Sequence, residues 1–263
     1  MRWKSCFAVG ILFAGLAVDN ARAADLPLNQ PVPALPSPGL QLYVRGEVGG
    51  AWLAQDRGYW IGPGAADPQI TESLNSPSSL TGGGAIGLQY WPGIRADVSV
   101  DYLGHFDVHG SPIAPGGGVG HSSMDAATTT NLVMGNIFIE PLRLANINTG
   151  FIQPFVTVGI GAAFNDFEDW SRTNPAAARP VRTFAGASQT NFAWSVGAGV
   201  SIGIDSLIHI PAWLDLTYRY VDAGHISGGS AVLSDPGPSP REPFNFRQSI
   251  NVATVGLRIP FSP

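Results

Sequence analysis

Residues 80–102 constrain the fold of this chain most, because they hold two runs of alternating side chains joined by a Pro92-Gly93 turn. In the second run, from Ile94 to Tyr102, every other residue is apolar, and the residues between them are arginine, aspartate or serine. Side chains of a strand point alternately to its two faces, so the stretch predicts a β-hairpin with one apolar and one polar face. A soluble sandwich turns the apolar face inward, whereas a membrane barrel turns it outward to lipid. One hairpin does not distinguish these two folds.

The rest of the chain repeats the pattern. From residue 40 onward the sequence predicts eight strands, at about 41–53, 80–91, 94–107, 126–140, 152–164, 191–203, 213–222 and 246–261. Long connections alternate with short ones; the long ones are 54–79, 108–125, 165–190 and 223–245, and the short ones are 92–93, 141–151 and 204–212. This alternation is typical of bacterial outer-membrane barrels, and each strand has the roughly 9–11 residues that a tilted strand needs to cross a bilayer. We therefore expect an all-β, eight-stranded antiparallel up-and-down transmembrane β-barrel with long extracellular loops and short periplasmic turns. Its closure leaves no unpaired strand edge in hydrocarbon.

Aromatic residues support this interpretation, because they fall at predicted outward positions, many near strand ends, where the membrane–water interfaces favour them. They are Trp52, Tyr90, Tyr102, Phe164, Phe192, Trp194, Tyr218, Tyr220 and Phe261. The facing of the strand at 126–140 is ambiguous, since apolar residues occupy both of its faces. We assign its odd-numbered set to lipid, namely Val133, Gly135, Ile137 and Ile139, and its even-numbered set to the interior, including Leu132, Met134 and Phe138.

Residues 1–23 have the pattern of a secretory signal peptide. Arg2 and Lys4 precede the apolar stretch 6–18, and Ala21-Arg22-Ala23 fits a small-x-small cleavage site. The apolar stretch is shorter than the roughly 20 residues of a membrane-spanning helix. Residues 24–39 follow as a proline-rich periplasmic leader, read as an extended spacer, and residues 40–263 form the predicted barrel domain.

Cleavage after residue 23 would change the chemistry available to the chain. The only cysteine and the only lysine leave with the signal peptide, so no thiol, disulfide or Schiff-base amine remains. Taking Arg2, Lys4, Arg22 and Asp19 from 14 basic and 19 acidic residues leaves 11 and 18, a net charge of about −7. So acidic a chain is a poor candidate for nucleic-acid binding.

The polar faces of four predicted strands carry charges of both signs in equal number. These inward positions are Arg45, Glu47, Arg95, Asp97, Asp101, Asp215, Arg219 and Arg258. Charges held away from bulk water need partners, so we expect a paired network that fills the lumen, with Arg258 close to Arg45 and Glu47 where the first and last strands meet. An eight-stranded barrel has an interior only wide enough for side chains. The alternative is a narrow small-solute or ion channel.

One histidine-rich segment raises the question of a metal site. His105, Asp107 and His109 continue the third strand with a period of two and so share one face, and His121 follows in the connection after it. Two imidazoles and a carboxylate could ligate a divalent metal. Without cysteines or a supporting pattern of neighbours, we interpret them as polar residues at the rim of the barrel. The acidic residues Asp166, Glu168 and Asp169 are likewise too few for a calcium loop, and we predict no metal and no cofactor.

Six segments together resemble the opacity-type outer-membrane β-barrel family, which comprises small eight-stranded surface antigens of Gram-negative outer membranes. They are LYVRGEVGGAW, GIRADVSVDYLG, FVTVGIGAAF, FAWSVGAGVSIGI, LDLTYRYVDAG and VGLRIPF, and they extend over roughly residues 40–261. The resemblance implies an outer-membrane location and a structural or surface-interactive role. It also implies contact with outer-membrane lipid and lipopolysaccharide, with the barrel-assembly machinery, and with an extracellular or host ligand through the long loops. Members of the family usually end in an aromatic residue, whereas here Ser262 and Pro263 follow Phe261.

An enzymatic alternative rests on His225-Ile226-Ser227 and Glu242. This set resembles the His-x-Ser plus Glu arrangement of lipid A deacylases, in which serine would be the nucleophile, histidine the base and glutamate its orienting partner. The motif of those enzymes is longer, His-x-Ser-Asn, and this chain departs from it because Gly228 occupies the position of the asparagine. We therefore predict loop residues here, no catalytic residue and no enzyme.

Overall fold

The computed structural model describes residues 40–113, 122–147, 149–173, 181–234 and 237–261. All of them belong to one compact unit, Pro38–Pro263. The predicted signal peptide (1–23) and leader (24–39) lie outside the described residues.

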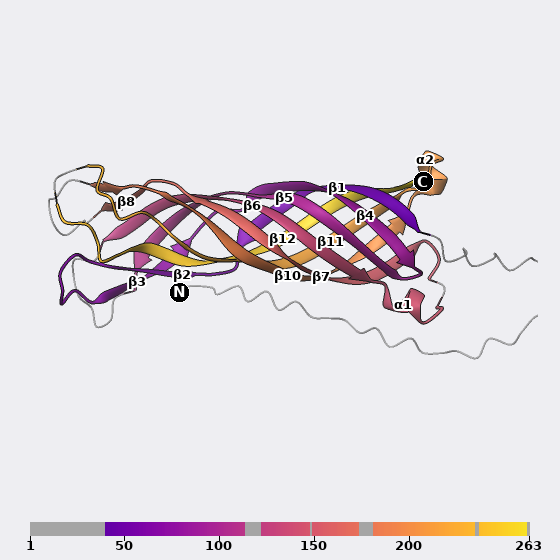
Figure 1. Cartoon of the computed structure of the whole chain (residues 1–263), viewed down its shortest axis with the longest axis horizontal. Coiled ribbons are helices and arrows are strands. Elements are labelled where there is room, and N and C mark those ends of the chain that lie inside the picture. The colour runs from indigo at the N-terminus through magenta and orange to yellow at the C-terminus, as the bar shows by residue number, and fades with distance from the viewer. Residues whose placement is uncertain (1–39, 114–121, 148, 174–180, 235–236, 262–263) are drawn as a thin grey trace, which may run out of the picture. The chain divides into compact units, whose positions relative to one another are not determined.

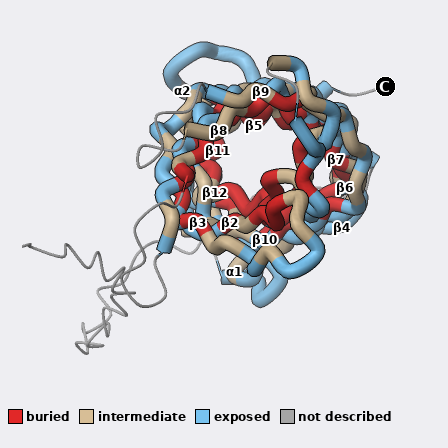
Figure 2. The backbone as a smooth tube through the Cα atoms, turned by 90° about the vertical axis from the view of Figure 1, so that its left-hand side faces the viewer, coloured by how far each residue is buried: buried red, intermediate tan, exposed pale blue. Residues whose placement is uncertain are grey.

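Eight long strands form a closed antiparallel ring (Figures 1 and 2). They are β1 (Gln41–Leu53), β4 (Ser79–Trp91), β5 (Ile94–Pro112), β6 (Ser123–Ile139), β7 (Ile152–Phe167), β10 (Ala187–Gly203), β11 (Trp213–Ser227) and β12 (Glu242–Phe261). Each pairs with the next in this order, and β12 pairs with β1, from Leu42 opposite Phe261 to Leu53 opposite Ile250. The predicted eight-stranded up-and-down barrel is confirmed, and it is the fold that the resemblance to opacity-type barrels implies.

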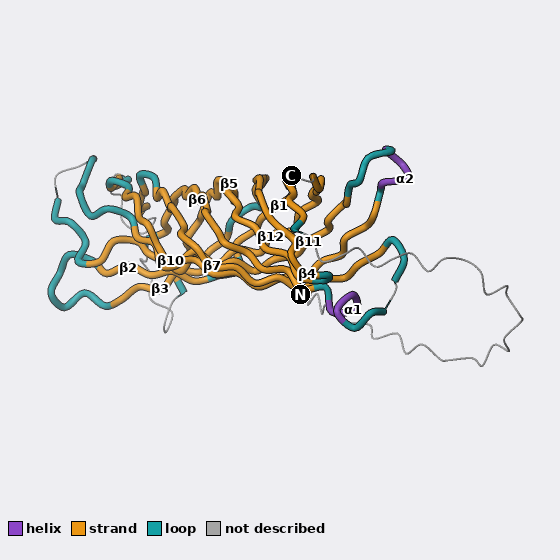
Figure 3. The backbone as a smooth tube through the Cα atoms, turned by 45° about the vertical axis from the view of Figure 1, so that its right-hand side comes forward, coloured by secondary structure: helices purple, strands orange, loops and turns teal. Residues whose placement is uncertain are grey.

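The two ends of the barrel differ, as the connection lengths predict. At one end lie the turn at Pro92-Gly93, where Gly93 has a φ of 86°, and two single helical turns, α1 (Pro141–Leu144) and α2 (Asp205–Ile208) (Figure 3). The described parts of the long connections lie at the other end. Among the described residues, no helix is long and apolar enough to cross a membrane.

The long-loop end contains more strand than the sequence predicts. Connections 54–79 and 165–190 were expected as loops, which is wrong, because they contain β2 (Arg57–Ile61), β3 (Gln69–Asn75), β8 (Trp170–Thr173) and β9 (Arg182–Phe184). The β2–β3 hairpin lies between β12 and β5, beyond the ends of β1 and β4, and continues the wall of the barrel. β8 pairs with β6 and β9 with β8. These short strands are fixed by the overhanging edges of longer ones, a tertiary cause with a weak local signal.

The outward side chains of the ring form an apolar belt. Large exposed apolar residues follow one another along every long strand, among them Val48, Ile86, Val98, Val133, Ile137, Val158, Val196, Leu216 and Val255. The odd-numbered set of β6 faces outward and Leu132, Met134 and Phe138 are buried, as predicted. Aromatic rings border the belt on both sides. Towards the long loops, Trp52 packs on Tyr218 at 6.2 Å and Trp194 on Tyr220 at 5.6 Å between ring centroids, and towards the short turns Tyr90 and Phe261 are exposed. Apolar residues between two aromatic girdles are the lipid-facing surface of an outer-membrane barrel.

Candidate functional site

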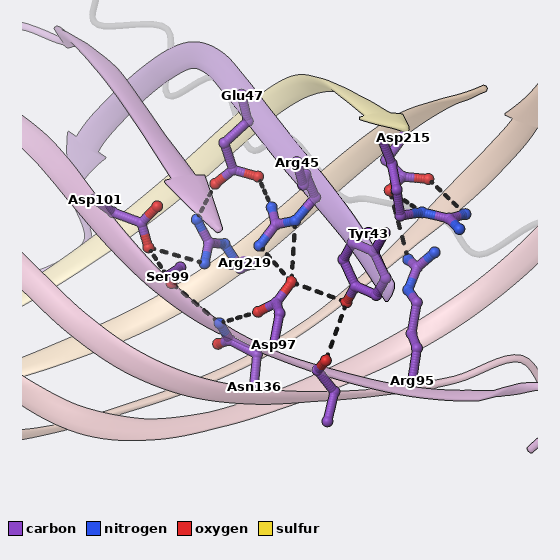
Figure 4. A network of polar contacts seen from close by, with 12 residues as sticks. Tyr43, Arg45, Glu47, Arg95, Asp97, Ser99, Asp101, Asn136, Asp215 and Arg219 are labelled. Atoms are coloured by element: carbon purple, nitrogen blue, oxygen red, sulfur yellow. Dashed lines mark hydrogen bonds and ion pairs between the residues drawn. The ribbon is translucent and has the colours of Figure 1, made fainter. Parts of the chain in front are cut away.

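The structure places all eight predicted lumen charges inside the barrel. Each is between 1% and 6% exposed. They come from four strands: β1 carries Arg45 and Glu47, β5 carries Arg95, Asp97 and Asp101, β11 carries Asp215 and Arg219, and β12 carries Arg258. On each strand these positions alternate with the lipid-facing residues, so the period-two pattern alone turns them inward. The contacts separate them into two groups (Figure 4).

The first group centres on Glu47. Its carboxylate accepts hydrogen bonds from both Arg45 and Arg219. Arg45 also binds Asp97, with 3.0 Å between Nη2 and Oδ2, and Arg219 Nη1 lies 3.6 Å from Asp101 Oδ2. Two guanidiniums and three carboxylates therefore form a continuous chain across the lumen between β1, β5 and β11.

Neutral side chains complete this first group. Asn136 donates from Nδ2 to Asp97 Oδ1 at 2.8 Å and to Ser99 Oγ at 3.1 Å. Ser99 in turn donates to Asp101 at 2.8 Å, and the Tyr43 hydroxyl donates to Asp97 at 3.2 Å. Buried carboxylates are stabilised when their remaining lone pairs find donors, and these residues supply such donors to Asp97 and Asp101.

The second group centres on Asp215 of β11. Its carboxylate lies 3.1 Å from Arg258 Nε and 3.7 Å from Arg95 Nη2, and it accepts the hydroxyl of Ser201 at 2.6 Å. The predicted closeness of Arg258 to Arg45 and Glu47 is confirmed, although the sequence did not indicate which carboxylate Arg258 would bind. Arg258 is the backbone partner of Arg45 in the β1–β12 register, but its ion pair is with Asp215 rather than with Glu47. Two facing guanidiniums repel each other, so Arg258 turns to the carboxylate on its other neighbouring strand.

Glu140 is a member of the network that the sequence analysis missed. It is buried at the end of β6, with its Oε1 3.6 Å from Arg95 Nη1 and its Oε2 3.3 Å from Arg143 Nη1. Its even number matches the inward set of β6, which could have identified it. Arg95 also lies over the rings of Phe138 and Phe155, at 4.5 and 4.7 Å from their centroids. These cation–π contacts help to hold a guanidinium in a site without bulk water.

Beyond this network, towards the long-loop end, the interior is apolar. This region was not predicted, because several of its residues fall in segments expected as loops. The largest side chains of this core are Phe106, Phe167, Trp170, Phe184, Phe244 and Phe246, all at most 2% exposed. Trp170 stacks on Phe184 at 4.2 Å, and Phe167 lies 6.2 Å from Phe244 and 6.0 Å from Phe246, measured between ring centroids. The barrel interior thus has a charged layer and an apolar layer.

The histidines of β5 lie outside the barrel. A bulge after Tyr102, with Gly104 at a φ of 120°, shifts the strand so that His105, Asp107 and His109 share the outward face. His105 lies 3.4 Å from Glu168, and His109 lies 2.6 Å from Asp125. Each imidazole therefore has its own acid partners. Among the described residues no group of three or more acids, histidines or cysteines is arranged to hold a metal ion, and His121 lies outside the described residues.

The prediction that the residues of the enzymatic alternative lie in a loop is wrong, because β11 and β12 extend into the connection 223–245 and hold all three. His225 and Ser227 are on β11, and Glu242 begins β12. The Ser227 hydroxyl donates to the carbonyl of Gly228 at 3.2 Å. Among the described residues, no hydrogen bond joins Ser227 to His225 or His225 to Glu242, which a serine nucleophile and its base would need.

Comparison with known proteins gives structural similarities only. No protein-family model and no curated protein sequence matches the chain. The chain is similar to the crystal structure of Neisserial surface protein A, at 13% identity over 85% of this chain and 99% of that one, with a TM-score of 0.40. It is similar to outer membrane protein OprG from Pseudomonas aeruginosa at 13% identity over 83% and 95%, with a TM-score of 0.45. It is similar to outer membrane protein AlkL in lipid bilayers at 16% identity over 93% and 97%, with a TM-score of 0.43.

Proposed function

We propose that this chain is a sealed barrel of the opacity type in the bacterial outer membrane, with a structural or surface-interactive role and no catalytic activity. The barrel would hold the β2–β3 and β8–β9 hairpins and the long loops at the cell surface. There they would meet an extracellular or host ligand. The observation that carries the proposal is the filled interior, with an ion-paired layer inside the membrane belt and an aromatic layer beyond it.

The ion-paired layer supports a plug because its members bind across the lumen. Arg219 of β11 contacts Glu47 of β1 and Asp101 of β5, so a single side chain ties three strands together. Separating these buried ion pairs costs free energy, because a charge that loses its partner is left unpaired and out of contact with water. A solute would have to break these pairs before it could pass.

Conductance in planar bilayers tests the plug. We expect the wild-type protein to show only small, unsteady currents, and Glu47→Ala to raise conductance, because Arg45 and Arg219 both lose their shared partner. Asp107→Ala, which removes an acid from the outer surface, is the control and should leave the current unchanged. A large, steady, voltage-independent current in the wild type, unchanged by Glu47→Ala, would favour the narrow-channel alternative and contradict the proposal.

The non-catalytic part of the proposal has a separate test. Cells that express the wild-type protein and cells that express Ser227→Ala should contain the same lipid A species by mass spectrometry. A deacylated species that accompanies the wild type and is absent with Ser227→Ala would establish an enzyme instead.

A further inference from the structure

Three basic side chains lie in a row on the outer wall of the barrel, across β11, β12 and β2. His225 is opposite Arg247 in the β11–β12 register. Asn245 is opposite Tyr59 and Phe246 opposite Gly58 in the β12–β2 register, so the next residues, Arg247 and Arg57, are neighbours as well. All three side chains are exposed and line one pocket of about 240 Å³, together with the polar residues Gln55, Gln69 and Thr71. We call His225, Arg247 and Arg57 the basic row.

The two arginine charges of the basic row, on Arg247 and Arg57, are only partly balanced by the described residues. Like charges directly opposite each other on neighbouring strands destabilise a sheet. Asp222 provides one counter-charge, accepting from Arg247 Nε at 2.6 Å, and this raises the pKa of Arg247. Arg57 has no side-chain hydrogen bond or ion pair among the described residues.

Asp222 also orients Arg247 for an external ligand. The carboxylate side chain of Asp222 is 4% exposed, and its other oxygen accepts the backbone N–H of Gly224 at 3.0 Å, so it is held in place. Asp222 contacts the guanidinium of Arg247 only at Nε, and the Arg247 side chain is 57% exposed. The Nη donors of Arg247 remain available beside Arg57, and paired guanidinium forks suit the oxygens of a phosphate group.

The distance of the basic row from the aromatic girdle indicates which kind of molecule carries such a phosphate. Asn251 is the register partner of Trp52 and of Tyr220, two residues of the aromatic girdle nearer the long loops. Arg247 lies four residues further along β12, roughly 13 Å along the strand and about 10 Å above the girdle once strand tilt is included. A phospholipid headgroup layer is only about 5–8 Å thick on each side of the bilayer. The basic row therefore matches phosphates carried on a sugar backbone above the acyl chains.

We infer that the basic row binds a phosphate group of the glycolipid in the outer leaflet, with Arg57 and Arg247 as the contacting residues and Asp222 as a positioning residue. The inference rests on the proposed place of the barrel in an outer membrane. It assigns a defined site on the outer wall, separate from the lumen and from the loops that would meet an extracellular ligand.

Lipid titration of the folded full-length chain in detergent micelles, read by native mass spectrometry, tests the site. We expect bisphosphorylated lipid A to bind the wild type, and Arg57→Gln or Arg247→Gln to weaken binding about ten-fold or more, the effect of losing a charge-assisted hydrogen bond. The affinity of Arg57→Lys for lipid A should lie between those of the wild type and Arg57→Gln, because lysine keeps the positive charge but loses the two parallel N–H donors of the guanidinium. Arg241→Gln is the matched control, since its guanidinium is bound to the carbonyl of Ala65 away from the row, and it should bind like the wild type.

Further lipids and inorganic phosphate distinguish the sources of the phosphate group. Dephosphorylated lipid A should bind at least ten-fold more weakly than the phosphorylated form. Binding that is equal for phosphatidylglycerol, or fully competed by millimolar inorganic phosphate, would overturn the assignment to a glycolipid. Equal binding by the wild type, Arg57→Gln and Arg247→Gln would overturn the site itself. Neither result changes bilayer conductance, so failure of the lipid site and failure of the sealed barrel are separable.

Discussion

Arg219 links two carboxylates that otherwise lack a common partner. It binds Glu47 and lies 3.6 Å from Asp101, and among the described residues no other ion pair reaches Asp101. Arg219→Ala therefore leaves buried negative charge uncompensated, and we expect it to lower the free energy of unfolding by about 3–5 kcal/mol. Urea unfolding in lipid vesicles, followed by tryptophan fluorescence, measures the change.

The controls for Arg219 separate charge from packing. Arg241→Ala removes an exposed arginine at the long-loop end and should cost less than about 1 kcal/mol. Addition of Asp101→Asn to Arg219→Ala should restore part of the lost stability, because it removes one of the stranded charges. Equal losses for Arg219→Ala and Arg241→Ala would mean that water reaches the lumen and screens the network.

Glu72 on β3 is a buried acid with no ion pair to any described residue. It is 0% exposed, and neither carboxyl oxygen has a hydrogen-bond partner among the described residues. Burial raises the pKa of Glu72 from 4.5 to about 7, an effect that the nearby indole of Trp60 opposes only in part, since no hydrogen bond of normal geometry joins them. The folded state therefore keeps a proton that the unfolded state loses, and stability falls as the pH rises from about 4.5 to about 7.

The prediction for Glu72 is a difference in pH dependence. Between pH 4.5 and pH 8 the wild type should lose about 1–3 kcal/mol more stability than Glu72→Gln, which cannot ionise. Unfolding curves of both proteins across this range test it. If the two proteins changed in parallel, Glu72 would not titrate in the folded barrel within that range.

Strand β5 shows how one residue changes the facing of a whole element. Its first half turns Arg95, Asp97 and Asp101 inward. The bulge at Gly104 then reverses the alternation, so that Phe106 joins the apolar core and the histidines face outward. A side chain at Gly104 would require an L residue at a φ of 120° and would place its Cβ 2.5 Å from Ser79 Oγ. The sequence predicts the strand, but a bulge depends on pairing across strands and has no reliable local signal.

The outer face of β5 gives a prediction about the membrane. Val98 is 61% exposed and lies halfway between Ile94, next to the short turn, and the outward-facing Tyr102. Val98→Arg should lower the free energy of unfolding in vesicles by about 2–4 kcal/mol, because it places a charge at the bilayer centre. His109→Arg, outward on the same strand but beyond the aromatic girdle and beside Asp125, should cost little. If both variants were tolerated equally, the belt would not lie in lipid.

The features of the fold that could be predicted from the sequence are those that follow from the period-two alternation of side chains. This alternation correctly gives the eight long strands, their facing and the eight lumen charges, since each follows from which residues share a face. It fails for β2, β3, β8 and β9, whose strand pairing is imposed by the overhanging ends of β5, β6 and β12. It also misses the choice of Asp215 by Arg258, because side-chain pairing depends on three strands at once.

The barrel interior has a charged layer and an aromatic layer, and its outer wall has an apolar zone and a polar zone. The boundary between the two layers lies at about the same height as the boundary between the two zones. The charged layer lies within the apolar belt, and the aromatic core lies beyond it, where the outer wall turns polar and carries the basic row. In water an apolar core is the ordinary way to stabilise an extended barrel end, whereas lipid stabilises the belt from outside and leaves the interior free to hold charges. The interior is thus charged where lipid surrounds the wall and apolar where water surrounds it.

The orientation of the barrel follows from the same asymmetry and gives the last prediction. Long connections face the cell exterior in outer-membrane barrels and short turns face the periplasm. An epitope tag inserted near Ala66, between β2 and β3, or at Pro240, before β12, should therefore be labelled by antibody on intact cells. A tag at Asn146 or His209, next to α1 or α2, should be labelled only after the outer membrane is permeabilised. Heat-modifiable gel mobility confirms that each tagged chain has folded. Labelling of the tags beside α1 and α2 on intact cells, with none at the long-loop end, would invert the barrel and place the basic row at the periplasmic leaflet, where the phosphate-bearing glycolipid proposed as its ligand would be out of reach.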